Sequence, residues 1–251
     1  MRLQPVNRRS VPDEVFDQVL SEVVDGGIGA GEALPSERRL AEVLGVSRPA
    51  VREALQRMAQ TRLLDVRHGG ATTVRDFRRY GGLDLLPRLL VRRGELDPAV
   101  ARSILEARLV VGPGVAALAA ERGGPAVEAV LVETVEALGG TEDGVERQRH
   151  ALAFWDLVVD AADSMVFRLM FNSLRAAYEP ALEALASLMA EEVGQVGAYR
   201  LLTAAIGAGD PETARAAADR VLRPATTSLL TALAALDSDQ LSEQPPDEED
   251  A

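Results

Sequence analysis

Cysteine is absent from the 251-residue chain, and histidine occurs only as His68 and His150. Without cysteine the chain can form neither a disulfide nor a thiolate metal site. It also lacks the G-x-S-x-G nucleophile motif and the glycine-rich P-loop, so no nucleophile stands beside a general base in any familiar catalytic pattern. We therefore expect a protein that is not an enzyme.

Lysine is also absent: all 27 basic residues are arginine, against 39 acidic residues, and the net charge is −12. Arginine donates through a planar fork that suits phosphate and guanine, although a genome rich in arginine codons would give the same composition. The charge is segregated, with 13 Arg and 11 acidic residues in positions 1–80 but 14 Arg and 28 acidic residues in positions 81–251. A nucleic-acid-binding surface is therefore expected in the N-terminal third.

Long apolar runs are missing too. None approaches the ~20 residues that span a bilayer, and the polar N-terminus has no signal-peptide core. We expect a cytoplasmic protein that makes no contact with a membrane and begins with a flexible arm over residues 1–11.

Residues 12–75 have the pattern of three short helices and a small wing. Apolar residues recur every three or four positions from Val15 to Val24, which predicts a helix that ends at the following glycines. Ser36 and Ser47 are good N-caps for two further helices, which end near Leu44 and Gln60. Two β-prone runs follow, over residues 63–67 and 72–75, and a His-Gly-Gly-Ala tip separates them.

The phase of the third helix places Arg48 and Arg52 on its outer face, at its N-terminal end. In a helix-turn-helix this end of the second helix enters the major groove and contacts base edges. Three nearby acids, Glu37, Glu42 and Glu53, are interpreted as structural partners of arginines.

Three segments carry a family resemblance: Leu34-Pro35-Ser36-Glu37-Arg38, Leu44-Gly45-Val46-Ser47-Arg48 and Val51-Arg52-Glu53-Ala54-Leu55. They resemble the DNA-binding domain of the GntR family of transcriptional regulators. The resemblance covers residues 12–75 and implies a winged helix-turn-helix that binds double-stranded DNA. One departure is Thr61-Arg62-Leu63-Leu64, where the family often has Gly-Leu before the wing. The residues implied to contact DNA are Arg38, Ser47, Arg48, Arg52, His68 and Gly69.

The rest of the chain is expected to be mainly α-helical. Residues 76–98 are predicted to form a connector with one short helix over residues 83–91. Residues 99–237 predict an antiparallel bundle whose core can hold a ligand, and the acidic, proline-containing tail 238–251 predicts disorder. Six helices are expected near 99–121, 125–138, 146–162, 164–190, 195–208 and 211–236, with breaks at residues 123–125, 139–140, 163–164 and 207–211.

The helical part resembles the FadR branch of the family, through Glu106-Ala107-Arg108 early in it and a Gly-Asp-Pro-Glu-Thr-Ala-Arg turn late. Many members of that branch hold a divalent metal with one Asp and three His. One histidine, His150, cannot supply such a site, so we expect no metal and an apolar pocket. The four positions that correspond to the ligands are here Ala151, Trp155, Tyr199 and Val221.

An apolar pocket suits a long hydrocarbon tail, since burial contributes about 0.8 kcal/mol per methylene. The chain also resembles the fatty-acid-responsive, metal-free members of the branch. This resemblance implies control of fatty-acid metabolism by a homodimer on an inverted repeat, released by long-chain acyl-CoA. The alternative is a regulator that responds to a small carboxylate or sugar acid.

Four residues are expected to contact the effector: Arg108, Trp155, Tyr178 and Tyr199. For Arg108 the alternative is a salt bridge to Glu106 or to a neighbouring helix. For the three aromatic residues it is ordinary core packing.

Overall fold

The computed structural model describes residues 10–66 and 71–242, in two compact units that meet at the Asp97–Pro98 bond. Each unit is described by itself. The predictions for His68, Gly69, most of the N-terminal arm and residues 243–251 lie outside the described residues.

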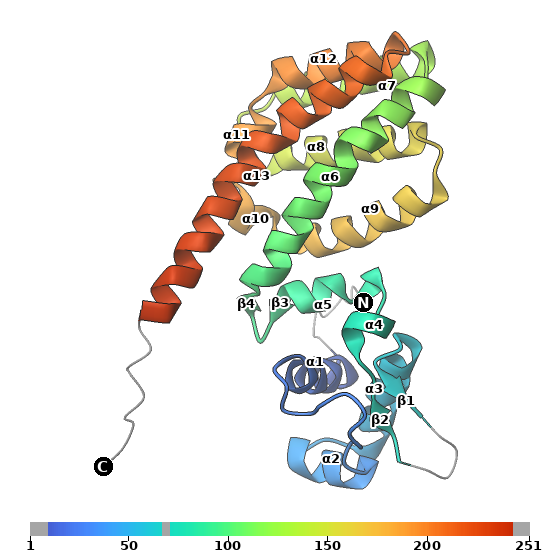
Figure 1. Cartoon of the computed structure of the whole chain (residues 1–251), viewed down its shortest axis with the longest axis vertical. Helices are drawn as coiled ribbons and strands as arrows, with labels where there is room; N and C mark the ends of the chain where they lie inside the picture. The colour runs from blue at the N-terminus through green and yellow to red at the C-terminus, as the bar shows by residue number, and fades with distance from the viewer. Residues whose placement is uncertain (1–9, 67–70, 243–251) are drawn as a thin grey trace, which may run out of the picture. The chain divides into compact units, whose positions relative to one another are not determined.

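The first unit contains the predicted winged helix-turn-helix (Figure 1). Strand β1 pairs antiparallel with β2, Leu64 opposite Val74. The loop before α2 adds an unpredicted bridge, in which the Leu34 backbone N–H donates to the Thr72 carbonyl at 2.8 Å. The elements are α1 Val11–Val24, α2 Glu37–Leu44, α3 Arg48–Gln60, β1 Leu64–Asp65 and β2 Thr73–Val74.

Serine caps start all three helices. The side chains of Ser10, Ser36 and Ser47 each accept a backbone N–H from the first turn of α1, α2 and α3. Gly45 ends α2 with a φ of 67°, a left-handed conformation that glycine adopts without steric cost. Arg62 takes the same region, with a φ of 62°. It therefore performs the turn before the wing for which the family often uses glycine, at some cost in backbone strain.

The core of the first unit lies where α1 crosses α3, and helix periodicity supplies it. Val15, Phe16 and Leu20 of α1 are buried against Val51 and Met58 of α3. Because these residues recur at intervals of three and four, the opposite face of α3 is left for solvent and carries polar side chains.

The expected connector is part of this first unit up to Asp97. Its Leu85 is 1% exposed and belongs to the same core. A short hairpin was not predicted: Arg93 and Gly94 both have positive φ, at 53° and 85°, as a two-residue type I′ turn requires. The elements are α4 Phe77–Tyr80, η1 Leu83–Leu85, α5 Leu86–Leu90, β3 Val91–Arg92 and β4 Glu95–Leu96.

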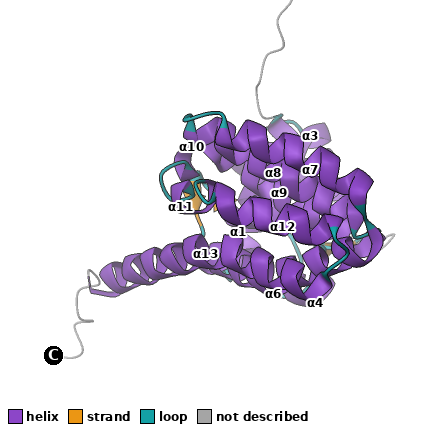
Figure 2. Ribbon diagram, turned by 90° about the horizontal axis from the view of Figure 1, so that it is seen from above, coloured by secondary structure: helices purple, strands orange, loops and turns teal. Residues whose placement is uncertain are grey.

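The second unit is all helical over its described residues (Figure 2). The prediction of one helix over residues 164–190 is wrong: α9 ends at Tyr178, because Pro180 cannot continue the backbone hydrogen bonding of an α-helix. The last helix continues to Ser242, so the predicted tail begins as helix. The elements are α6 Pro98–Arg122, α7 Pro125–Gly139, α8 Gly144–Ala161, α9 Met165–Tyr178, η2 Glu179–Ala181, α10 Leu182–Leu185, α11 Ala190–Val193, α12 Val196–Gly207 and α13 Pro211–Ser242.

Helices α6 and α13 pack along each other in this unit. Gly112 permits the close approach, since a Cβ at that position would lie 2.5 Å from Leu222 Cδ1. Contrary to expectation, α6 is long and apolar enough to cross a membrane, with a mean hydropathy of 1.5 in its most apolar stretch. Its buried residues, among them Val115 and Ala116, belong to the core of the bundle, and core helices commonly have this composition.

Candidate DNA interface and ligand pocket

The N-terminal end of α3 presents a guanidinium group next to a carboxylate of α2. Arg52 Nη2 lies 2.8 Å from Glu37 Oε2, and Arg52 Nε lies 3.1 Å from Glu37 Oε1. This two-point pairing raises the pKa of Arg52 and lowers the pKa of Glu37. Arg48 is exposed, and its charge also lowers the pKa of Glu37. The two arginines thus share one acidic neighbour while their side chains stay open to solvent.

Two further predicted contacts, Ser47 and Arg38, belong to the start of α3 and to α2. Ser47 accepts the Ala50 N–H at 3.4 Å and so caps α3. The side chain of Arg38, which is 73% exposed, pairs with Glu42 at 3.3 Å. The interpretation of Glu37, Glu42 and Glu53 as partners of arginines is confirmed, since Glu53 pairs with Arg57 at 2.6 Å.

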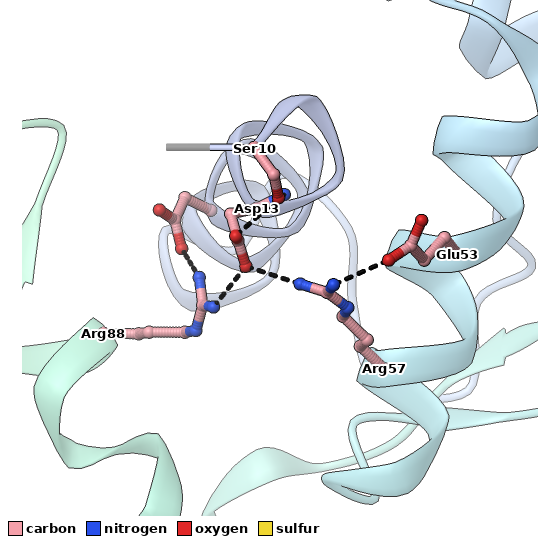
Figure 3. Close-up of polar contacts among 6 residues, drawn as sticks. Ser10, Asp13, Glu53, Arg57 and Arg88 are labelled. Atoms are coloured by element: carbon pink, nitrogen blue, oxygen red, sulfur yellow. Dashed lines mark hydrogen bonds and ion pairs between the residues drawn. The ribbon is translucent and has the colours of Figure 1, made fainter. Parts of the chain in front are cut away.

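A half-buried carboxylate that the sequence did not single out connects three elements of this unit (Figure 3). Asp13 Oδ1 of α1 accepts from Arg57 of α3 at 2.8 Å and from Arg88 of α5 at 2.9 Å. Its other oxygen accepts from the Ser10 hydroxyl at 2.6 Å. The Ser10 hydroxyl and then the guanidinium groups of Arg88 and Arg57 hold the pKa of Asp13 below its ordinary value, although burial opposes them.

Arg88 fastens the segment after the wing to α1. It also pairs with Asp17, and its guanidinium carbon lies 4.3 Å above the centre of the Phe16 ring. A cation over an aromatic face is attracted by the ring quadrupole. The Asp13 network therefore joins α3 to the residues that lead out of the first unit.

The second unit has a small apolar pocket of about 60 Å³ between α6, α8 and α9. Arg108 is the charged residue among those that line it. The apolar lining includes four residues of one face of α9, at intervals of three and four: Phe167, Met170, Phe171 and Leu174.

Arg108 points to a buried partner. Its Nη2 donates to Oε1 of Glu192 on α11, a residue that is 2% exposed. Burial opposes the charge of Arg108, but Glu192 outweighs this effect and raises the pKa of Arg108. The alternative of a salt bridge to a neighbouring helix is therefore the one observed.

The three aromatic residues predicted to contact the effector differ in their surroundings. Trp155 lines the pocket. Tyr199 is fully buried, with its ring edge-to-face on Phe154 at 4.9 Å. Tyr178 donates to Gln148 Oε1 at 2.5 Å. Burial, and then the negative charge of Glu192, raise the pKa of both tyrosines, which places them in the electrostatic surroundings of Arg108 and Glu192.

The positions that correspond to the branch's metal ligands gather in the core. Ala151, Trp155, Tyr199 and Val221 all belong to one buried cluster. No group of three or more His, Cys, Asp or Glu able to hold a metal occurs in residues 10–66 or 71–242. Aliphatic side chains and an indole are not metal ligands, and burial keeps the phenol of Tyr199 protonated by raising its pKa, so these residues do not fit a divalent metal.

A winged helix that presents arginines from its third helix, followed by an all-α unit, defines a DNA-binding transcriptional regulator. The chain belongs to the GntR family, as a FadR-like member. The family model "Bacterial regulatory proteins, gntR family" matches residues 12–74, and the model "FCD domain" matches residues 103–224.

Named relatives agree with this assignment. The HTH-type transcriptional regulator Mce2R of Mycobacterium tuberculosis is 58% identical over 233 residues, 93% of this chain and 97% of the relative. The fatty acid metabolism regulator protein of Vibrio cholerae is 30% identical over 118 residues, 47% of this chain and 42% of the relative. Among solved structures, Lar, which controls the Listeria monocytogenes agr system, has a TM-score of 0.55 at 14% identity, covers 90% of this chain and 99% of its own, and shares the fold.

Proposed function

We propose that this regulator binds an inverted-repeat operator as a homodimer and that a long-chain fatty acyl-CoA releases it, so that it controls fatty-acid metabolism from the cytoplasm. A two-fold dimer places two α3 helices on successive major grooves. Arg48 and Arg52 are the residues assigned to guanine O6 and N7, with Arg38 and Ser47 on phosphates. His68 and Gly69 are assigned to the wing contact.

The lining of the pocket carries the effector part of this proposal. Ten of the eleven residues around it are apolar or glycine, and the remaining one is Arg108. Such a surface suits a hydrocarbon chain with an anionic end, each buried methylene contributing about 0.8 kcal/mol. Ala151, Trp155 and Val221 offer no metal-ligand atom, and burial raises the pKa of the Tyr199 phenol, so the proposal involves no metal and no other cofactor. It also assigns the chain no catalytic activity.

The size of the pocket requires a change when the effector binds. Ligand sites are usually about 300–1,000 Å³, against about 60 Å³ here. Helix α9 is the element able to move outward, since Ala177 is its one buried residue. Effector binding then shifts the bundle and alters the spacing of the two DNA-binding units, provided that the effector binds the two states unequally.

The same small volume favours a second candidate, a small carboxylate or sugar acid bound by Arg108. The experiment that decides between the two measures release of a fluorescent operator duplex by palmitoyl-CoA and by a panel of small organic acids. The proposal predicts release by micromolar palmitoyl-CoA and no release by the small acids. Release by a small acid alone would establish the second candidate, and calorimetry with no heat from palmitoyl-CoA would exclude the first.

A further inference from the structure

Glu192 is a buried acid, and a contribution to stability does not by itself explain why it is there. It is 2% exposed, on the four-residue helix α11. One of its oxygens accepts from Arg108, and the other, Oε2, has no hydrogen-bond partner among the described residues. A buried ion pair gives little net stability, and an unpartnered buried oxygen has a desolvation cost.

Arg108 is the residue that connects Glu192 to the pocket. It lines the apolar cavity, and within the described part of the chain it makes one hydrogen bond, from Nη2 to Glu192. A guanidinium has five N–H donors in a planar fork. The pocket therefore ends at a cation that already binds one carboxylate and has donors left for an anion in the cavity.

We propose that Glu192 is an internal substitute for the anionic head group of the effector, and that the incoming anion takes Arg108 from it. This inference rests on the proposed function of the pocket. Two carboxylates around one buried guanidinium would leave a net negative charge in a low-dielectric interior, which is costly. Glu192 and the ligand anion are therefore mutually exclusive partners of Arg108.

Replacement of Glu192 by the ligand anion on Arg108 would couple ligand binding to a movement of α11. A displaced Glu192 cannot stay buried and charged without a partner, so α11 has to move. This helix is attached to the long helix α13, where the Ser228 hydroxyl donates to Glu191 Oε2 at 3.1 Å, and its Val193 belongs to the core. The ligand thus selects between two positions of α11, one with Glu192 inside and one with Glu192 outside.

Two sources supply an anionic oxygen at the end of a hydrocarbon chain: the carboxylate of a free fatty acid and the phosphates of acyl-CoA. Palmitate and palmitoyl-CoA distinguish these sources, and 1-hexadecanol supplies the same chain with a neutral head group. Trp155 is the single tryptophan of the chain and lines the pocket, so its fluorescence reports binding of all three in the full-length protein.

The test compares Glu192→Gln with the wild type and with Glu183→Gln, which changes an exposed acid on helix α10. Removing the internal anion is expected to increase affinity for the anionic ligand by about tenfold, within the roughly 5–150-fold range of typical coupled equilibria. Glu183→Gln is expected to leave affinity unchanged, and 1-hexadecanol is expected to bind the wild type and Glu192→Gln equally. Arg108→Gln is expected to lose the preference for an anion over 1-hexadecanol.

Hydrogen exchange supplies a second readout and confirms that each variant is folded. Ligand binding is expected to speed exchange in residues 190–193 of the wild type and not in Arg108→Gln. If palmitate or palmitoyl-CoA binds but Glu192→Gln binds it no more tightly than the wild type, the substitution role of Glu192 is wrong while the proposed function stands. If neither the wild type nor Glu192→Gln binds any of the ligands, both are wrong.

Discussion

The two units use the same pair of groups, a guanidinium and a carboxylate, in opposite surroundings. In the first unit Arg52 and Glu37 are 57% and 31% exposed; in the second, Glu192 is 2% exposed beside Arg108. Exposed pairs contribute about 0–1 kcal/mol, whereas breaking a buried pair by removing one partner costs about 3–5 kcal/mol. We therefore expect the surface pair to exchange easily for a DNA phosphate or base, and the buried pair to yield only to a ligand that brings its own apolar burial.

The largest effect is expected from Arg108→Ala, which leaves Glu192 buried without its cation. We expect the free energy of unfolding to fall by about 3–5 kcal/mol, measured by urea denaturation with Trp155 fluorescence. Arg149→Ala, which removes an exposed arginine of the same unit, is the control and is expected to change stability by less than about 0.5 kcal/mol. Equal losses in the two variants would contradict the contrast between buried and exposed pairs.

Arg48→Ala is expected to weaken binding to the specific operator by about 1–3 kcal/mol, because a bidentate contact to guanine is lost. Binding to a scrambled duplex is expected to weaken far less. Arg48→Lys keeps the positive charge but removes the planar pair of donors, so it is expected to retain non-specific binding and to lose the preference for the operator over the scrambled duplex. Fluorescence anisotropy at fixed salt measures both duplexes, and equal loss on both would show that Arg48 contacts phosphate only.

Asp13→Asn is expected to lower stability by about 1 kcal/mol at neutral pH, because two arginines lose their shared carboxylate. The folded-state pKa of Asp13 is lowered, so its contribution is fully present above the unfolded pKa of about 3.9 and disappears as the pH falls through the lowered value. Denaturation of the variant and wild type across this range, with Glu14→Gln as control, measures the difference. A difference that persists in strong acid would mean that packing, and not charge, is responsible.

The smallest effect is expected from Glu37→Gln. Its partner Arg52 is exposed, so the loss of stability should be at most about 0.5–1 kcal/mol and should vanish at high salt, where exposed pairs are screened. Thermal denaturation at low and high salt checks this. A loss as large as that of Arg108→Ala would place the two pairs in the same class.

The sequence predicted α1, α2 and α3 because their apolar spacing and capping residues lie within each helix. Ser36 and Ser47 cap α2 and α3 as their positions indicate, and the apolar spacing from Val15 onward gives α1. Two elements were predicted wrongly or missed although the sequence contains a local signal for each: the end of α9 and the hairpin β3–β4. Pro180 ends α9, and the two-residue turn at Arg93-Gly94 forms a hairpin.

Long-range pairs could not be predicted in the same way. Asp13 meets Arg57 and Arg88 from 44 and 75 residues away, and Glu192 meets Arg108 from 84 residues away. No spacing rule connects residues so far apart, because their meeting depends on how whole helices pack. The sequence could place Arg48 and Arg52 on one surface because a single helix carries them. It could not predict that residues of α9 would line the pocket beside Arg108.

We infer that the arginines at the start of α3 contact base pairs. The deciding measurement is the affinity of the full-length protein for a duplex from its own upstream region, compared with a scrambled duplex of the same composition at physiological salt. We predict a preference of at least about 10³-fold, the lower end for specific regulators. Equal affinity for the two duplexes would contradict the account.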